Sequence, residues 1–291
     1  MKVYCRSLFV AVFLLCALVV NAQQSGREKI GEALERDGCV SLESSKVKIC
    51  KYDYVSNNQA VEAISFQPLG SGTFPALMLI PGYQRSARDY IPLGTIFAKE
   101  GFACVAITQP GFGKSQGKPD FVGSNTIKAL TDGFDKFKRE PYVDAKRMGV
   151  FGYSRGAMAA SLLAVQLHDI RAAVFGGGIY DFKKAYDEIK DEGIRKNMEQ
   201  EAGISQEAIK QRSSVLQMKN LRCPVLILHG EKDENAPISQ ALLLRDQLTA
   251  LKKDFEIKIL PNKGHGLDMQ EVFTNSLDFF KRKLVVDTSK K

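Results

Sequence analysis

The sequence predicts an α/β protein with a mostly parallel sheet of eight strands and helices on both faces. Short apolar runs flanked by Gly or Pro alternate with amphipathic stretches, as in buried parallel strands joined by helices. A long polar stretch over 183–220 interrupts this alternation after the sixth strand and predicts a small helical cap. Apolar residues make up 44% of the chain and charged residues 25%, which excludes a mainly disordered protein.

The first two expected strands begin the sheet as an antiparallel hairpin over 47–55 and 61–66, joined through Ser56, Asn57 and Asn58. Six buried strands follow, each a run of four to six residues: 76–80, 103–107, 148–151, 172–175, 225–228 and 255–260. Amphipathic periodicity predicts helices between and after them: 87–99, 126–139, 156–167, 239–252 and 270–283.

The stretch 183–220 carries sparse apolar residues at helical spacing among many charged ones. We expect two or three helices that cover the carboxyl edge of the sheet. An ordinary long connection is the alternative, but the stretch is several times longer than a usual loop.

The N-terminus has the pattern of a secretory signal peptide. Lys2 and Arg6 precede a thirteen-residue apolar run, and Val20 and Ala22 are small enough for cleavage after Ala22. An uncleaved membrane anchor is the alternative, although the run is shorter than the roughly 20 residues that span a bilayer. We therefore expect a signal peptide over 1–22, a secreted or periplasmic location and a single mature domain over 23–291.

Charge and cysteine content limit the classes of partner. Cleavage would lower the formal net charge from +8 to +6, and the basic residues are dispersed, whereas a nucleic-acid surface needs a cluster. Cys39 and Cys50 can bridge in an oxidising compartment, while Cys104 and Cys223 lie in apolar runs and are expected to be buried. Because no C-x-x-C pair is present, we expect no structural zinc.

The segment Gly152-Tyr153-Ser154-Arg155-Gly156 follows an apolar strand and opens an amphipathic helix. This is the context of a nucleophile elbow, a turn too tight for a Cβ at its flanking glycines, which raises the serine hydroxyl at the carboxyl edge of the sheet. Ser154 is therefore the expected nucleophile.

A serine nucleophile needs a base, and the base needs an acid to orient it. His265 lies in a glycine-flanked loop after the last strand, whereas His168 ends the helix that follows Ser154 and His229 more plausibly shapes a loop. Asp233 follows the seventh strand and is the expected acid. The alternatives to Asp233 are three acids near the same edge: Asp181, Glu231 and Glu234.

Acyl transfer also needs donors for a tetrahedral oxyanion. We expect the backbone N–H of Arg155, directly after the nucleophile, and that of Tyr83, in the loop Pro81-Gly82-Tyr83-Gln84 after the third strand. An ordinary strand-ending turn is the alternative for that loop. Arg85 and Arg155 can favour an anionic substrate group, or each can be a solvated surface residue.

Two glycine-rich segments do not match nucleotide-binding motifs. Gly113-Lys114-Ser115 lacks the glycine that a phosphate-binding loop requires at position 108, and Gly176-Gly177-Gly178 lacks the G-x-G-x-x-G spacing. We expect the segment 110–115 to shape the floor of the pocket. The sequence implies no cofactor and no metal.

Five motifs together resemble the α/β-hydrolases, and specifically the prolyl oligopeptidase and dienelactone-hydrolase-like branch. They span about residues 46–283 and begin at Pro81-Gly82-Tyr83, Pro110-Gly111-Phe112, Gly152-Tyr153-Ser154, His229-Gly230-Glu231 and Gly264-His265-Gly266. The resemblance implies an α/β-hydrolase fold, the triad Ser154, Asp233 and His265, and oxyanion donors at Tyr83 and Arg155.

The chain also departs from that branch. Too few residues precede the first strand for an N-terminal β-propeller, and no acidic helix matches the one with which dipeptidyl peptidases hold a substrate amino terminus. We therefore expect an enzyme that cleaves small-molecule esters. A small serine peptidase acting on short peptides and a non-catalytic binding protein are the alternatives.

Overall fold

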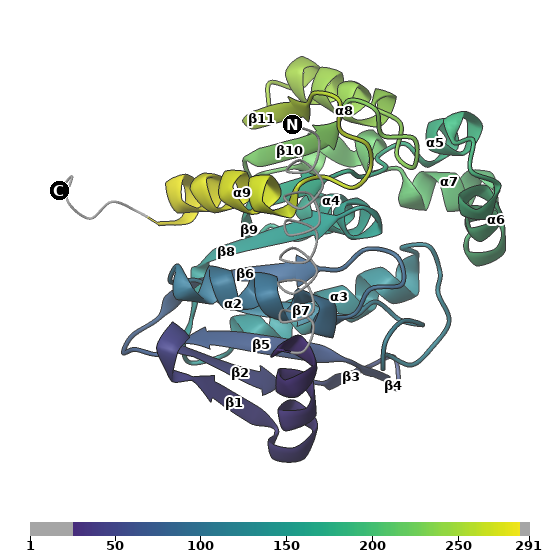
Figure 1. The fold of residues 1–291 in the computed structure, drawn as a ribbon. Coiled ribbons are helices and arrows are strands. Elements are labelled where there is room, and N and C mark those ends of the chain that lie inside the picture. Colours follow the sequence, from purple (N-terminus) through teal and green to yellow (C-terminus); the bar gives the residue numbers. More distant parts are fainter. Residues whose placement is uncertain (1–25, 286–291) are drawn as a thin grey trace, which may run out of the picture.

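A mixed sheet of nine strands forms the centre of the computed structural model, which describes residues 26–285 (Figure 1). Across the sheet the order is β1 (Cys39–Leu42), β2 (Val47–Lys51), β5 (Ala63–Pro68), β7 (Ala103–Ile107), β6 (Phe74–Ile80), β8 (Val143–Tyr153), β9 (Ile170–Gly176), β10 (Val225–Gly230) and β11 (Phe255–Leu260). Pairings from β1 to β7 are antiparallel, and those from β7 to β11 are parallel. The predicted fold class is confirmed, with nine strands instead of eight.

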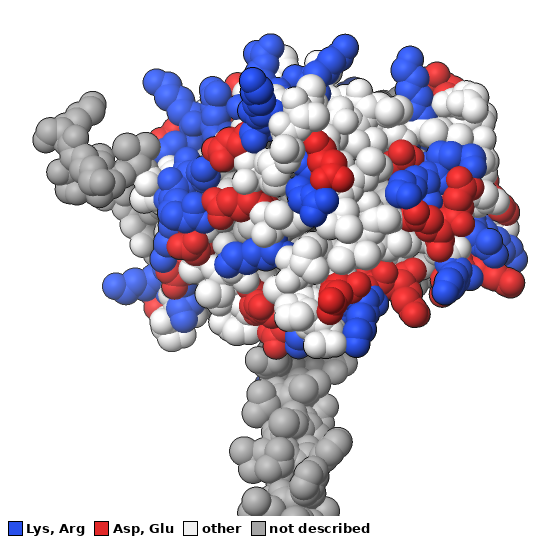
Figure 2. All heavy atoms as spheres, turned by 90° about the horizontal axis from the view of Figure 1, so that it is seen from above, with Lys and Arg blue, Asp and Glu red and all other residues white. Residues whose placement is uncertain are grey.

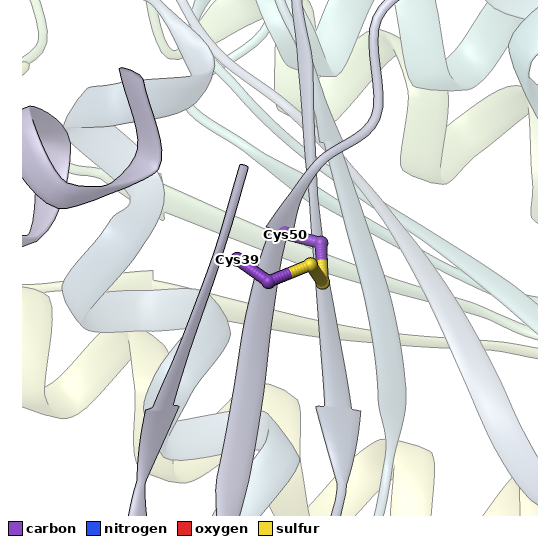
Figure 3. The surroundings of a disulfide bond; sticks show 2 residues. All are labelled: Cys39 and Cys50. Atoms are coloured by element: carbon purple, nitrogen blue, oxygen red, sulfur yellow. A yellow bond between two sulfur atoms is a disulfide. The ribbon is translucent and has the colours of Figure 1, made fainter. Parts of the chain in front are cut away.

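The additional strand is β1, at the edge of the sheet. Cys39 lies directly opposite Cys50 of β2, and the two form a disulfide (Figure 3). The sequence pattern missed β1 because it is only four residues long and exposed or half-exposed throughout. An edge strand of this kind lacks the continuous apolar run of a buried one.

The expected hairpin over 47–55 and 61–66 divides into two pairings. β2 pairs with β5, and a separate two-stranded sheet joins β3 (Tyr54–Ser56) to β4 (Gln59–Val61). Asn57 and Asn58 turn between β3 and β4 with φ of 49° and 58°, the left-handed conformation of a tight hairpin turn. The predicted turn is therefore correct, but the strands on each side of it are interrupted.

Helices cover both faces of the sheet, as predicted. One face carries the helix over 26–37, η2 (Ala87–Tyr90), α2 (Ile91–Lys99) and α9 (Met269–Leu284). The other carries α3 (Ser124–Lys138), α4 (Arg155–Gln166) and α8 (Ser239–Ala250). Strand side chains alternate between two apolar cores, so that Leu77 and Leu79 pack on the first face and Met78 and Ile80 on the second.

Between β9 and β10 the chain forms α5 (Phe182–Glu188), α6 (Glu192–Glu201), α7 (Gln206–Arg212) and the 3₁₀ helix η3 (Ser214–Asn220). These helices lie at the carboxyl end of the parallel strands (Figure 1). Met198 of α6 is fully buried in the second core, so the segment packs on the sheet rather than projecting as a free loop. A further 3₁₀ turn, η1 (Glu43–Ser45), joins β1 to β2.

Basic and acidic side chains are interspersed on the face drawn in Figure 2. At the end of α9, Lys281 pairs with Glu100 and Arg282 pairs with Glu256. Within residues 26–285 no helix is long and apolar enough to cross a membrane, and no cluster of His, Cys, Asp or Glu is arranged to hold a metal ion. The predicted signal peptide lies outside the described residues and stays a prediction.

Candidate active site

Ser154 stands in the turn between β8 and α4. Its φ of 56° and ψ of −123° lie outside the ordinary regions for an L-residue, as the tight turn of a nucleophile elbow requires. The Ser154 N–H donates to the carbonyl of Gly176 on β9 at 2.7 Å, which fixes the turn to the neighbouring strand.

The two flanking glycines are required by close backbone approach. A Cβ at position 152 would lie 2.1 Å from the carbonyl oxygen of Gly156, and one at position 156 would lie 2.0 Å from that of Ile80. Real Cβ atoms do not approach backbone so closely. The glycines that the motif predicts therefore let the first turn of α4 pack directly against β6 and β8.

Three side chains from separate loops meet at the carboxyl edge of the sheet. His265 Nε2 lies 2.8 Å from Ser154 Oγ, and His265 Nδ1 lies 2.8 Å from Asp233 Oδ2. The sequence placed all three residues at this edge, and the structure brings them into contact in series. In this arrangement an imidazole can take the serine proton while the carboxylate holds the ring's tautomer.

The acid of this series lies in a rigid loop after β10. The Asp233 side chain is fully buried, and its Oδ1 accepts the N–H groups of Asn235 at 3.0 Å and Ala236 at 2.8 Å. His229 Nε2 contacts the Ala236 carbonyl at 2.7 Å, so this ring shapes the loop, as predicted. Burial lowers the pKa of His229, which keeps the ring neutral beside Asp233.

The alternative residues have other partners. Asp181 caps α5 by accepting the Lys184 N–H at 3.0 Å, and Glu231 accepts the Asn262 N–H at 2.8 Å. Glu234 is exposed, and so is His168, which lies past the far end of α4 from Ser154. Among the described acids, Asp233 is therefore the one bonded to the His265 ring.

Tyr153 links the nucleophile to the loop of the base, a contact that sequence reasoning missed. Its hydroxyl donates to the His265 carbonyl and accepts the Leu267 N–H at 3.1 Å. Burial raises the pKa of Tyr153 to about 12, so the phenol stays protonated and can donate at neutral pH. One hydroxyl thus holds the chain on both sides of the imidazole, and no local pattern in the sequence indicates a bond across 112 residues.

Tyr153→Phe is expected to lower kcat/KM about tenfold, the equivalent of roughly 1.4 kcal/mol, because it removes both bonds and loosens the His265 loop. Tyr54→Phe is the matched control, since the Tyr54 hydroxyl donates to the Ala129 carbonyl at 2.6 Å, away from the site. Ester turnover and urea unfolding of both variants measure the difference. Equal losses of kcat/KM would show that the Tyr153 hydroxyl has only a structural role.

The expected oxyanion donors lie beside the serine. A Cβ built on Gly82 would be 3.3 Å from Ser154 Cβ, so the loop after β6 runs directly against the nucleophile. Within residues 26–285 no protein acceptor receives the N–H of Tyr83 or of Arg155. Both groups are therefore available to a ligand, and α4 begins at Arg155 with the positive end of its dipole toward the site.

A cavity of about 610 Å³ opens over Ser154, a size typical of small-molecule sites. Its wall includes Tyr83, Phe121, Met158 and Ile179, and the helical segment adds Asp191, Ile194 and Asn197. The segment 110–115 does not line this cavity, contrary to the expectation that it forms the floor. Tyr83 and Phe121 form the wall in its place. The segment lies behind Tyr83, where the Phe112 ring packs edge-on against the Tyr83 ring with 5.4 Å between the ring centroids.

The expectation that Arg155 attracts an anionic substrate group is not supported by its contacts. The Arg155 side chain is 6% exposed, and its Nη1 donates to Glu201 Oε2 at 2.6 Å. Burial lowers the pKa of Arg155 and the charge of Glu201 opposes that shift. At the rim, Arg27 and Arg85 both face Asp89, at 2.9 and 3.6 Å. Glu201 neutralises Arg155 from behind the wall, and the other two arginines of the lining, Arg27 and Arg85, are matched by Asp89 and Asp191, so that the charges around the cavity balance.

Fold and site together define a serine hydrolase on an α/β-hydrolase sheet. The chain belongs to the prolyl oligopeptidase family, whose model matches residues 95–286. The resemblance inferred from the motifs is thereby confirmed.

Individual relatives agree with this assignment. An uncharacterized peptidase of Bacillus subtilis (strain 168), YtmA, is 29% identical over 219 residues, covering 73% of this chain and 84% of the relative. Dipeptidyl-peptidase 5 of Porphyromonas gingivalis is 28% identical over 183 residues, 58% of this chain but 26% of the relative. The chain therefore matches only about a quarter of that enzyme.

Solved structures share the fold at low sequence identity. Pyrococcus horikoshii acylaminoacyl peptidase superposes with a TM-score of 0.73 at 19% identity, over 82% of this chain and 42% of that one. Acetyl xylan esterase from Paenibacillus sp. R4 superposes with a TM-score of 0.72 at 16% identity, over 89% and 93% of the two chains. The same sheet and helices thus serve enzymes named as peptidases and as esterases.

Proposed function

We propose that this serine hydrolase cleaves small, uncharged carboxylic esters through an acyl-enzyme on Ser154. The observation that carries the proposal is the unbroken series Ser154, His265 and Asp233, with both joining distances at 2.8 Å, at the wall of a cavity of about 610 Å³. A hydroxyl, an imidazole and a buried carboxylate in this order are the groups that nucleophilic acyl transfer requires.

In the proposed reaction, His265 Nε2 accepts the Ser154 proton as Oγ attacks the ester carbonyl. Asp233 holds the other ring nitrogen and stabilises the imidazolium that forms. The N–H groups of Tyr83 and Arg155 donate to the oxyanion. The imidazolium then protonates the leaving alcohol, and the neutral ring next activates a water that releases the acid and restores the serine.

Two features support an uncharged ester as the substrate. The charges around the cavity balance, so the site has no surplus cation for an acidic group. The name of the acetyl xylan esterase that shares this fold also supports an ester as the substrate. The alternative is a peptidase that cleaves short peptides, which the names of the prolyl oligopeptidase family and of the Bacillus relative favour.

A substrate panel tests the proposal. p-Nitrophenyl acetate and butyrate are compared with aminoacyl and prolyl p-nitroanilides, using the wild-type protein and Ser154→Ala. We expect turnover of the esters by the wild type and a loss of at least about 10⁴-fold in Ser154→Ala, because the acyl-enzyme cannot form.

Circular dichroism of the variant controls for folding. Preferential cleavage of the anilides, abolished in Ser154→Ala, would establish the peptidase instead. Undiminished ester turnover by a folded Ser154→Ala would refute the acyl-enzyme.

We also propose that the protein is exported to the periplasm or the cell exterior. The charged and apolar pattern of residues 1–22 supports this, and so does the Cys39–Cys50 disulfide, since disulfides persist in oxidising compartments. The intact mass of the exported protein should correspond to a chain that begins at Gln23. A mature chain that retains residues 1–22 would contradict the cleavage.

A further inference from the structure

The Arg155 side chain lies against aromatic rings from the loops that follow β6 and β7. Its guanidinium carbon lies 4.4 Å from the ring centroid of Tyr83 and 4.1 Å from that of Phe121, with Phe112 at 5.6 Å. The same group pairs with Glu201 at the end of α6. Three segments distant in sequence, which carry Tyr83, Phe112 with Phe121, and Glu201, therefore meet on one buried cation.

Glu201 holds a second part of the same cluster. Its Oε2, which accepts from Arg155, also accepts the Phe121 N–H at 3.2 Å. Phe121 and Val122 have φ of 44° and 60°, a left-handed conformation that costs free energy in non-glycine residues. Arg212 of α7 donates to the carbonyl of Phe121 at 3.0 Å and to that of Asp120 at 2.7 Å. Glu201 and Arg212 of the helical segment thus hold the strained loop of residues 120–122 in the conformation that places the Phe121 ring against Arg155.

Tyr83, the other ring close to the guanidinium, has few other supports. The residue is 37% exposed, and the next residue, Gln84, again has a left-handed φ of 54°. The ring packs edge-on with Phe112 and presents a face to Arg155, and its hydroxyl accepts from Gln84 Nε2 of the same loop at 3.3 Å. Before Tyr83, the Pro81 carbonyl accepts from the Gln109 side chain at 2.7 Å and the Gly82 carbonyl accepts the Arg85 N–H at 3.2 Å. Beyond these bonds, the guanidinium of Arg155 is the contact that ties Tyr83 to the helical segment.

We propose that the Arg155 side chain, oriented by Glu201, is a positioning residue that holds the Tyr83 N–H in place to receive the oxyanion. The inference rests on the proposed function and adds a second role to Arg155, whose own N–H is the other donor. A planar guanidinium that is hydrogen-bonded to a carboxylate has a fixed orientation, which a flexible apolar side chain lacks. The need for this orientation explains why the site has a buried Arg155–Glu201 ion pair, although two apolar residues there would avoid the cost of desolvating the charges.

The test compares Glu201→Gln with the double variant Arg155→Met/Glu201→Met, which leaves no unpaired buried charge and retains the residue-155 N–H. We expect kcat for p-nitrophenyl butyrate to fall about 10- to 100-fold in both, approaching the loss of one oxyanion donor, while KM changes less than about threefold. A trifluoromethyl ketone, which forms a tetrahedral oxyanion on the serine, should bind more weakly by the factor lost in kcat/KM.

Asp187→Asn is the matched control, because the exposed pair of Lys183 and Asp187 lies on α5 of the same helical segment and away from the cavity. We expect wild-type kcat from it. Thermal melting shows whether each variant is folded, and the double variant decides the outcome if Glu201→Gln does not fold.

Three outcomes would overturn the inference. The first is a raised KM with unchanged kcat, which assigns the pair to substrate binding. The second is a double variant with wild-type kcat, which assigns any defect of Glu201→Gln to its unpaired charge. The third is unchanged affinity for the trifluoromethyl ketone. Each is distinct from failure of the proposed function, in which a folded Ser154→Ala would itself retain ester turnover.

Discussion

Asp233→Asn is expected to lower kcat by about 10⁴-fold while the protein stays folded. Asp233 Oδ1 accepts two backbone N–H groups of its own loop, and Oδ2 is the oxygen nearer to His265 Nδ1, at 2.8 Å against 3.0 Å for Oδ1. The oxygen of an asparagine would therefore take the Oδ1 side, and its NH₂ would face His265 from the Oδ2 side. An NH₂ donates to Nδ1 and thereby forces the ring hydrogen onto Nε2, the atom 2.8 Å from Ser154 Oγ. An Nε2 that carries a hydrogen cannot accept the serine proton.

Glu234→Gln is the control for this prediction, because Glu234 is the next residue, is exposed and does not line the cavity. Steady-state kinetics on a short ester measure both variants, and circular dichroism checks their folding. If Asp233→Asn retains more than about a tenth of the wild-type kcat, another acid orients the base.

Gly156→Ala is expected to destabilise the protein by at least about 3 kcal/mol and to abolish soluble, active enzyme. The added methyl would lie 2.0 Å from the carbonyl oxygen of Ile80 and 2.9 Å from that of Pro81. Alanine ordinarily favours a helix over glycine, so helix propensity alone predicts stabilisation. The clash dominates because both partners are backbone atoms at the end of a central strand and cannot move aside as a side chain can.

Gly70→Ala is the matched substitution, since its methyl would be 3.6 Å from the tip of the Phe74 ring, an ordinary contact. Urea unfolding gives the free energy of unfolding for both variants. A Gly156→Ala protein as stable as Gly70→Ala would mean that α4 does not pack against β6 as closely as described.

Both neighbours of Ser154 have side chains that organise the site. Tyr153 holds the chain on either side of His265, and Arg155 joins the oxyanion loop to Glu201 of α6. The elbow therefore contacts both the loop of His265 and the helical segment. If Arg155 acts as proposed, a substitution in α6, far from Ser154 in the sequence, changes catalysis through it.

Much of the fold was predictable because its signals are local. The parallel strands are short apolar runs, and that over residues 255–260 matches β11 at both ends. Ser154, Asp233 and His265 were placed at one edge because parallel strands all end there. The helices over 183–220 followed from spacing alone, although their contacts did not. Strand β1 was missed because a short, exposed edge strand has no apolar run.

The sequence by itself determined the order of strands and helices, the elbow with its two glycines and the polar residues at each strand end, because each depends on a few consecutive side chains. Tertiary structure alone decided what those residues touch. Arg155 contacts Glu201, 46 residues away, and Tyr153 contacts the His265 carbonyl, 112 residues away. Tyr153 and Arg155 are the two neighbours of Ser154 in the sequence. Such contacts arise only when folding encloses distant segments together, since a charge or a hydroxyl finds its partner in space and not along the chain.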